Sequence, residues 1–317
     1  MTTQPLFSAP HHPVVVMPRA DGGLDALLDD LAARPTWMPG LLLEHGGVLL
    51  RGFRIDDAVQ FQRCAQALGA VAGSYAGGNS PRTQVADDVF TSTEFPAGET
   101  ISLHQEMSYL PRPPRRLFFH CLIPATLGGQ TTLAHAGDVL RAMPPAIVDE
   151  FRTRRLRYVR TFQPEGRLGK TWQATWGTED AAQVERAIAA QGSTFTWLAG
   201  GGLRVETLCD GLATHPATGE ALWFNQAEQW HASALAPATR ALLEDSFGAG
   251  NLAHHCEFED GPLAEDMLAE IRATLRANRL LFDWRRGDLL MIDNHTLMHG
   301  REPFRGSRRT LVILSDT

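Results

Sequence analysis

The stretch LHQEMSY, residues 103–109, contains the feature on which the interpretation of this chain depends: His104 and Glu106, separated by one residue. In an extended segment, residues i and i+2 point to the same face, so both side chains could reach one ion. His299, near the C-terminus, would complete a set of two imidazoles and one carboxylate. Such a set leaves three metal coordination positions open, as in non-haem Fe(II) oxygenases.

A second His-x-Glu pair, His255 and Glu257, occurs in the segment HHCE at 254–257. In a chain with 12 His and 36 acidic residues, about 1.4 His-x-acid pairs are expected by chance, so spacing alone does not choose between the two. Context separates them. The first pair is followed by GGQT at 128–131, whereas the second lies in a segment typical of a polar connection before a helix. We therefore predict that only the first pair binds a metal.

Several elements together resemble the taurine dioxygenase (TauD/TfdA) family of Fe(II)/2-oxoglutarate-dependent oxygenases. Their order and spacing span most of the chain and are more specific than any one of them. They are His104-Gln105-Glu106, Gly129-Gln130-Thr131, Asp293-Asn294, His299-Gly300-Arg301 and Arg309.

Further segments resemble the branch of this family found in nonribosomal-peptide and related natural-product pathways. They are GGVLLRGF at 46–53, SPR at 80–82, TSTE at 91–94 and HPATGEALWFNQ at 215–226. His135 departs from the family pattern, which more often has an acid or amide there, and we expect a structural role for it.

The resemblance implies that His104, Glu106 and His299 hold Fe(II), with 2-oxoglutarate taking two of the open positions and O2 the third. It also implies that Thr131 is the hydroxyl partner of the distal carboxylate of 2-oxoglutarate. That carboxylate needs a cation, and a guanidinium can bind it through two hydrogen bonds. Arg309 begins the next expected strand after His299, and we choose it as the anchor. In a strand, its neighbour Arg308 would face the opposite side.

The resemblance also implies the reaction. Related halogenases have a small residue at the carboxylate position, so the presence of Glu106 disfavours halogenation. The expected course is oxidative decarboxylation of 2-oxoglutarate to succinate and CO2, coupled to hydroxylation of an aliphatic carbon. The protein sets the order of binding and positions one C–H bond, while the metal and the cosubstrate carry out the oxidation. Desaturation and cyclisation stay open, because substrate placement decides between them.

The residues expected to bind the primary substrate carry a weaker signal. Arg82 and Glu94 could hold the carboxylate and ammonium of an amino acid, and Asn225 and Gln226 could add neutral hydrogen bonds. Loop and capping roles are an equal alternative for each of them. We predict as substrate an amino acid or amino-acyl group, free or bound to a carrier protein, in a biosynthetic pathway.

Three alternatives remain at this stage. The same chemistry could act on a sulfonate, a sulfate ester or another small acid used as a nutrient. A zinc-dependent hydrolase could use the same His/Glu/His set, but it would need a general base beside its metal-bound water. The third alternative is a binding protein on a degenerate jelly roll, which an intact ligand set disfavours.

Net charge, cysteine content and hydrophobic pattern indicate which partners and which cellular compartment to expect. A formal net charge of −7 disfavours a nucleic-acid partner. The four scattered cysteines indicate buried thiols in a reducing compartment; they are Cys64, Cys121, Cys209 and Cys256. No stretch approaches the length of a membrane span, and residues 1–13 lack the basic and apolar regions of a signal peptide. We expect a cytoplasmic protein whose residues 1–13 are a flexible segment.

The organisation along the chain favours one domain over 1–317, of α+β class. Short strands at both ends enclose a helix-rich middle, which fits a jelly roll decorated by helices. The resemblance implies the same architecture, a double-stranded β-helix (jelly-roll, cupin-like) core with flanking and inserted helices. Strands are predicted at 48–53, 117–124, 195–209, 288–293 and 309–315, and helices at 57–68, 138–155, 178–191, 237–247 and 262–278.

Overall fold

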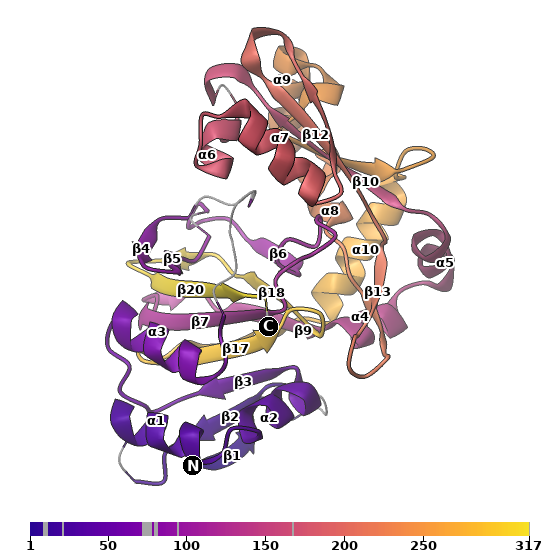
Figure 1. Ribbon diagram of the computed structural model, residues 1–317. Coiled ribbons are helices and arrows are strands. Elements are labelled where there is room, and N and C mark those ends of the chain that lie inside the picture. Colours follow the sequence, from indigo (N-terminus) through magenta and orange to yellow (C-terminus); the bar gives the residue numbers. More distant parts are fainter. Residues whose placement is uncertain are drawn as a thin grey trace.

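Figure 1 shows the computed structural model of the chain, which describes residues 1–8, 12–20, 22–71, 78, 82–93, 95–166 and 168–316. The helices are α1 (Leu24–Ala33), α2 (Trp37–His45), α3 (Ala58–Ala67), α4 (Ala136–Ala142), α5 (Pro145–Thr153), α6 (Trp172–Trp176), α7 (Ala181–Ala190), α8 (Ala227–Trp230), α9 (Pro237–Phe247) and α10 (Glu265–Ala277).

The strands of the first half of the chain are β1 (Thr2–Pro5), β2 (Val14–Met17), β3 (Gly47–Leu50), β4 (Gln84–Ala86), β5 (Val89–Thr91), β6 (Ile101–His104), β7 (Arg116–Ile123), β8 (Leu127–Gly128), β9 (Thr131–His135) and β10 (Leu156–Phe162). Those of the second half are β11 (Thr194–Trp197), β12 (Leu203–Cys209), β13 (Leu212–Thr214), β14 (Ala221–Trp223), β15 (His254–Phe258), β16 (Leu280–Phe282), β17 (Leu289–Asp293), β18 (Leu297–Arg301), β19 (Phe304–Arg305) and β20 (Arg309–Ser315).

Two sheets form the core. The larger has the strand order β1-β2-β3-β17-β7-β20-β5-β4, and the smaller has the order β16-β9-β18-β6. One hydrophobic cluster joins them, with Phe119 and Val312 from the larger sheet and Leu133 and Leu297 from the smaller. Strands from both ends of the chain thus share each sheet, and the predicted α+β fold with a jelly-roll core is confirmed.

The other face of the large sheet is covered by α1, α2 and α3 (Figure 1). Phe61 of α3 packs in the same cluster as Phe118 of β7, whereas Phe119 faces the interior of the core. Both faces of β7 are therefore buried. Because a doubly buried strand has no polar side, the sequence there is a continuous apolar run, which correctly predicted a core strand at 117–124.

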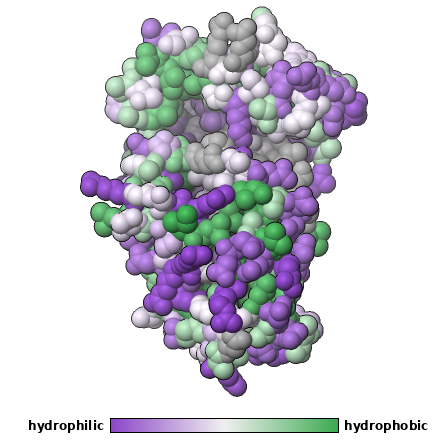
Figure 2. Space-filling model, turned by 90° about the vertical axis from the view of Figure 1, so that its left-hand side faces the viewer, coloured by the Kyte–Doolittle hydropathy of each residue, from purple (hydrophilic) through white to green (hydrophobic). Residues whose placement is uncertain are grey.

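The chain between the core strands builds a separate sheet in the order β11-β12-β10-β15, packed with α6 and α7. It stands above the core in Figure 1, and Figure 2 shows a recess beneath this upper part of the molecule. The expected polar connection at 254–257 is wrong: His254–Phe258 is strand β15, paired with β10. Its Cys256 and Phe258 are buried, so alternate residues face the interior and supply the packing that holds the strand.

The N-terminal segment also differs from the expectation. Residues 1–13 were predicted to be flexible, but Thr2–Pro5 forms strand β1, which pairs antiparallel with Val14–Met17. Hydrogen bonds between β1 and β2 satisfy the backbone N–H and C=O groups of this segment, and nothing in the sequence predicted that pairing. Residues 9–11 lie outside the described part of the chain. Within that part, no helix is both long and apolar enough to cross a membrane.

Gly300 provides a test of how closely the strands of the small sheet pack. A Cβ at this position would lie 2.4 Å from the carbonyl oxygen of Ile101 and 2.4 Å from Oγ1 of Thr132. Since a backbone atom cannot rotate away, Gly300→Ala should lower the free energy of unfolding by about 1–3 kcal/mol. In Gly250→Ala the added methyl group meets nothing within 4 Å, so its effect should stay within about 0.5 kcal/mol. Urea unfolding of both variants measures this, and equal effects would contradict it.

Candidate metal centre

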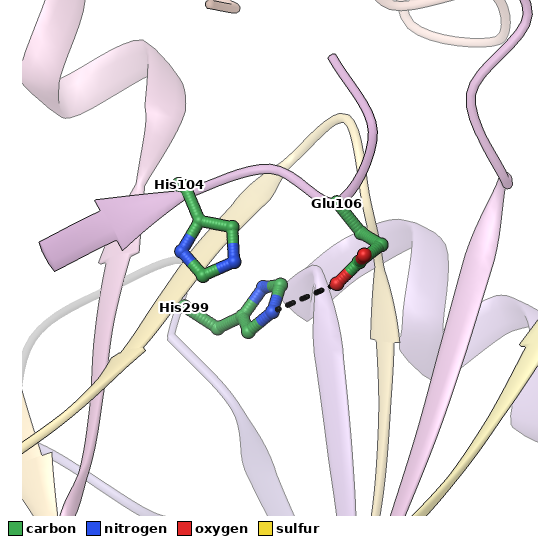
Figure 3. A group of neighbouring side chains, drawn as sticks. All are labelled: His104, Glu106 and His299. Atoms are coloured by element: carbon green, nitrogen blue, oxygen red, sulfur yellow. Dashed lines mark ion pairs between the residues drawn. The ribbon is translucent and has the colours of Figure 1, made fainter. Parts of the chain in front are cut away.

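His104, Glu106 and His299 converge, although they come from opposite ends of the core sequence (Figure 3). Strands β6 and β18 are antiparallel neighbours, and their register puts His299 directly opposite His104. The two ring centroids are 4.3 Å apart. One potential ligand atom from each of the three side chains lies within 4.8 Å of the others, and no other such group of three occurs among the described residues. The first His-x-Glu pair is thus the one that gains a third partner.

Glu106 reaches the group by a different route from the one predicted. Strand β6 ends at His104, and Glu106 lies in the turn that follows, so strand alternation does not orient it. Met107, the next residue, has a left-handed backbone with φ of 56°. The turn brings the Glu106 carboxylate to 3.9 Å from Nε2 of His299, the contact dashed in Figure 3. A change of backbone direction, rather than an extended segment, aims the carboxylate.

Both imidazoles are in the form that binds metals. Nδ1 of His104 lies 2.9 Å from the carbonyl oxygen of Ser102; a carbonyl only accepts, so Nδ1 carries the hydrogen and Nε2 keeps its lone pair. Burial holds the pKa of His299 well below its usual value, and the nearby His104 and Arg82 act in the same direction. His299 Nδ1 is buried and has no hydrogen-bond partner in the described part of the chain. Two imidazoles and a carboxylate fit a divalent transition metal.

Arg82, predicted to bind substrate, lies at the same place. Its Nη2 donates to Oε2 of Glu106 at 2.7 Å, and its side chain is 2% exposed. It lines one pocket together with His104 and His299. The structure therefore gives Arg82 a first contact that the sequence did not predict, with the carboxylate of the candidate metal ligand.

Thr131 lies in this pocket, as predicted, and its hydroxyl accepts a hydrogen bond from Nε1 of Trp284 at 2.8 Å. Because the indole only donates, the hydroxyl hydrogen of Thr131 stays available for an acceptor in the pocket. Trp284 gave no signal in the sequence. Its contribution depends on the fold, which brings the segment after β16 beside the start of β9.

The structure corrects the choice between the two neighbouring arginines. Arg308 lines the pocket and Arg309 is exposed outside it. As predicted, strand alternation puts Arg308 and Arg309 on opposite faces, but the inner face is that of Arg308. Thr310 also lines the pocket, so residues 308 and 310 share the inner face. Burial, with the charge of Arg301 nearby, lowers the pKa of Arg308 to about 10, so it stays cationic at neutral pH. Arg308 makes no hydrogen bond within the described residues, so this half-buried guanidinium can accept an anion as its partner.

Asn225 and Gln226, also predicted to bind substrate, do not line the pocket. Asn225 donates to the carbonyl oxygen of Gly211 and accepts from the backbone N–H of Ala227. Gln226 donates to the carbonyl oxygen of Gln105 and accepts from Trp230. The alternative role, satisfying buried backbone and capping a helix, is the one that the structure has. Glu94 lies outside the described residues.

Two further side chains clarify the site. Arg301 lines the pocket, but its guanidinium donates to the carbonyl oxygens of Phe95, Pro96 and Glu99, so it holds a loop in place. His135 accepts from the N–H of Gly137 at the start of α4, which confirms its expected structural role.

Comparisons with known proteins agree with this geometry. The sequence matches the family model described as "Taurine catabolism dioxygenase TauD, TfdA family" over residues 10–314. It is 32% identical over 315 residues to the dapdiamide synthesis protein DdaC of Enterobacter agglomerans, covering 99% of this chain and 94% of that protein. It is 29% identical over 286 residues to a clavaminate synthase-like protein of Arabidopsis thaliana, covering 88% and 84%.

Solved structures share the fold at low sequence identity. PvcB of Pseudomonas aeruginosa matches with a TM-score of 0.58 at 19% identity, covering 99% of this chain and 90% of that one. A taurine dioxygenase from Burkholderia xenovorans matches with a TM-score of 0.56 at 13% identity, covering 99% and 89%. At these identities the likeness shows the architecture alone.

The two His-x-Glu pairs allow a matched test of metal binding. Glu106→Ala should weaken Mn(II) binding by at least about 100-fold, since it removes a ligand and not merely a supporting group. Glu257→Ala removes the carboxylate of the other pair, 3.3 Å from His255, and should leave the affinity unchanged. Titration followed by the EPR signal of free Mn(II) measures both. Tight binding by the Glu106 variant would overturn the ligand assignment.

Proposed function

Because this chain belongs to the TauD, TfdA family and is an Fe(II)- and 2-oxoglutarate-dependent dioxygenase, we propose that it hydroxylates an amino acid or amino-acyl group in a biosynthetic pathway. The observation that carries the chemistry is the convergence of His104, Glu106 and His299, at a pocket that His104 and His299 line together with a half-buried cation, Arg308. The biosynthetic setting is supported by the similarity to a protein named for dapdiamide synthesis.

We assign the Fe(II) ligands to His104, Glu106 and His299. Bound there with 2-oxoglutarate and O2, the metal supplies the oxidant that removes hydrogen from an aliphatic carbon, with release of succinate and CO2. The chain contributes a ring nitrogen from each of the two histidines and a carboxylate held by Arg82. Burial of the site limits the access of water, which strengthens the interactions that order the reactants.

For the cosubstrate we propose Arg308 as the cation for the distal carboxylate and Thr131 as its hydroxyl donor. Support comes from two properties of the pocket. Arg308 brings a half-buried positive charge with no hydrogen bond inside the described part of the chain, and Thr131 keeps a free hydroxyl hydrogen. A carboxylate satisfies both, because it accepts several hydrogen bonds at once.

For the primary substrate we propose that Arg82 binds a carboxylate beside the metal. Arg82 holds Glu106 through Nη2 and lines the pocket beside His104 and His299, so its positive charge lies where a substrate carboxylate would approach the metal. Glu94 stays a proposed partner for the substrate ammonium. The substrate is a small molecule or an amino-acyl group bound to a carrier protein, and the net charge of −7 disfavours nucleic acid.

We further propose one domain over residues 1–317 in a cytoplasmic protein. The family model matches residues 10–314 as one unit, which supports the single domain. All four cysteines are free and buried, and free thiols fit a reducing compartment.

The neighbouring arginines provide a test of the cosubstrate site. Arg308→Ala should raise the KM for 2-oxoglutarate by about 10- to 100-fold, since hydrogen bonds to charged groups contribute about 1.5–3 kcal/mol. Arg309→Ala, at the exposed neighbouring position, should change it by less than about twofold. Succinate formation at varied 2-oxoglutarate measures both. The reverse order of effects would restore Arg309 as the anchor.

Substrate class is tested by product formation. With Fe(II), 2-oxoglutarate and O2, the enzyme should form succinate faster when given amino acids or amino-acyl thioesters, and the substrate should gain one oxygen by mass spectrometry. Taurine and other sulfonates serve as the matched comparison, because the name of the matching family model includes taurine catabolism. Stimulation by sulfonates alone would refute the amino-acid proposal while leaving the reaction class intact.

A further inference from the structure

We propose that Asn294 is a positioning residue for the metal centre, which fixes the backbone of Glu106 and so determines where its carboxylate points. The inference rests on the proposed role of Glu106 as a metal ligand. Asn294 is neither one of the three candidate ligands nor part of the pocket lining, so its whole effect would pass through the backbone of the ligand loop.

The contacts of Asn294 are all with backbone atoms. Its Oδ1 accepts from the N–H of Glu106 at 2.8 Å, and its Nδ2 donates to the carbonyl oxygen of Glu106 at 3.0 Å. Nδ2 also donates to the carbonyl oxygen of Pro114 at 2.8 Å. The side chain is 0% exposed. One carboxamide therefore binds both backbone polar groups of the same residue, which restricts its rotation about either neighbouring bond.

The ligand loop needs such an external support. Glu106 lies after β6 has ended, so no strand partner satisfies its N–H and carbonyl oxygen. Met107 then adopts a left-handed backbone, with φ of 56°, which a residue with a side chain rarely takes unless its surroundings impose it. Asn294 supplies the hydrogen bonds that a sheet would otherwise provide.

The origin of Asn294 links the two halves of the metal site. It stands in the turn between β17 and β18, and β18 carries His299. The turn itself is fixed: Oδ1 of Asp293 accepts from the N–H groups of His295 and Thr296. The segment that passes from β17 of the large sheet to β18 of the small sheet thus carries one proposed ligand, His299, and holds another through Asn294. This arrangement sets the spacing of the Glu106 carboxylate and the His299 ring.

Other contacts should keep the loop folded when Asn294 is removed. Gln105 donates to the carbonyl oxygen of Trp223, and its own carbonyl oxygen accepts from Gln226. Arg82 holds the Glu106 carboxylate. We therefore expect that in variants at position 294 the Glu106 carboxylate is less precisely positioned, while the loop stays folded.

The test measures metal affinity and stability together. Asn294→Ala should weaken Mn(II) binding by about 10- to 100-fold, the range typical of groups that orient a metal ligand. Asn225→Ala is the matched control, because Asn225 is also a buried asparagine that bonds backbone atoms, of Gly211 and Ala227, away from Glu106. It should lower the thermal unfolding midpoint of the metal-free protein comparably and change Mn(II) affinity by less than twofold.

A second variant covers the case in which Asn294→Ala does not fold. Asn294→Asp keeps the volume and the acceptor for the Glu106 N–H but replaces the Nδ2 donor by an oxygen that faces the carbonyl oxygens of Glu106 and Pro114, so it should weaken Mn(II) binding and alter the EPR line shape of bound Mn(II). Wild-type affinity and line shape in either folded variant would overturn the proposal, as would an equal affinity loss in Asn225→Ala. If Glu106→Ala itself binds Mn(II) tightly, the ligand assignment fails instead, and the two failures are distinct.

Discussion

The antiparallel pairing of β6 with β18 is the constraint on which the rest of the site depends. Its register puts His299 opposite His104, so the backbone ladder of the small sheet fixes two imidazoles 4.3 Å apart between ring centroids. Close approach of the strands requires a residue without a side chain at Gly300. The placement of the two histidines of the candidate metal centre is thus set by sheet packing, which is more rigid than a loop.

Burial then affects the charge of each ionisable group at the site and the partner that it needs. It keeps His299 neutral, as a metal ligand must be, and it leaves Arg308 as a cation that calls for an anion. Glu106 faces Arg82, so its negative charge is balanced. The same low-polarity surroundings that make an isolated charge costly make these pairings specific, and a keto acid with a distal carboxylate meets the requirement of Arg308.

Sequence analysis predicted correctly those features that depend on local pattern. The doubly buried strand at 117–124 is an apolar run, and the helix at 237–247 begins after Ala236 with proline at its first position, where the structure has it. It could not decide where two interpretations differ only by register or by the use of a polar group. Arg308 and Arg309 are equivalent until the face of β20 is known, and Asn225 and Gln226 turn toward backbone instead of the pocket.

The sequence by itself determined the chemistry: the types of the ligand side chains, their order and the motifs around them, because these follow from what a ferrous site and a keto acid require. Only the tertiary structure decided how the ligands are held. Glu106 is aimed by a left-handed turn and by Asn294, 188 residues later in the chain, and its charge is met by Arg82. No repeating pattern in the sequence predicts such contacts, because the residues are brought together only when the chain folds.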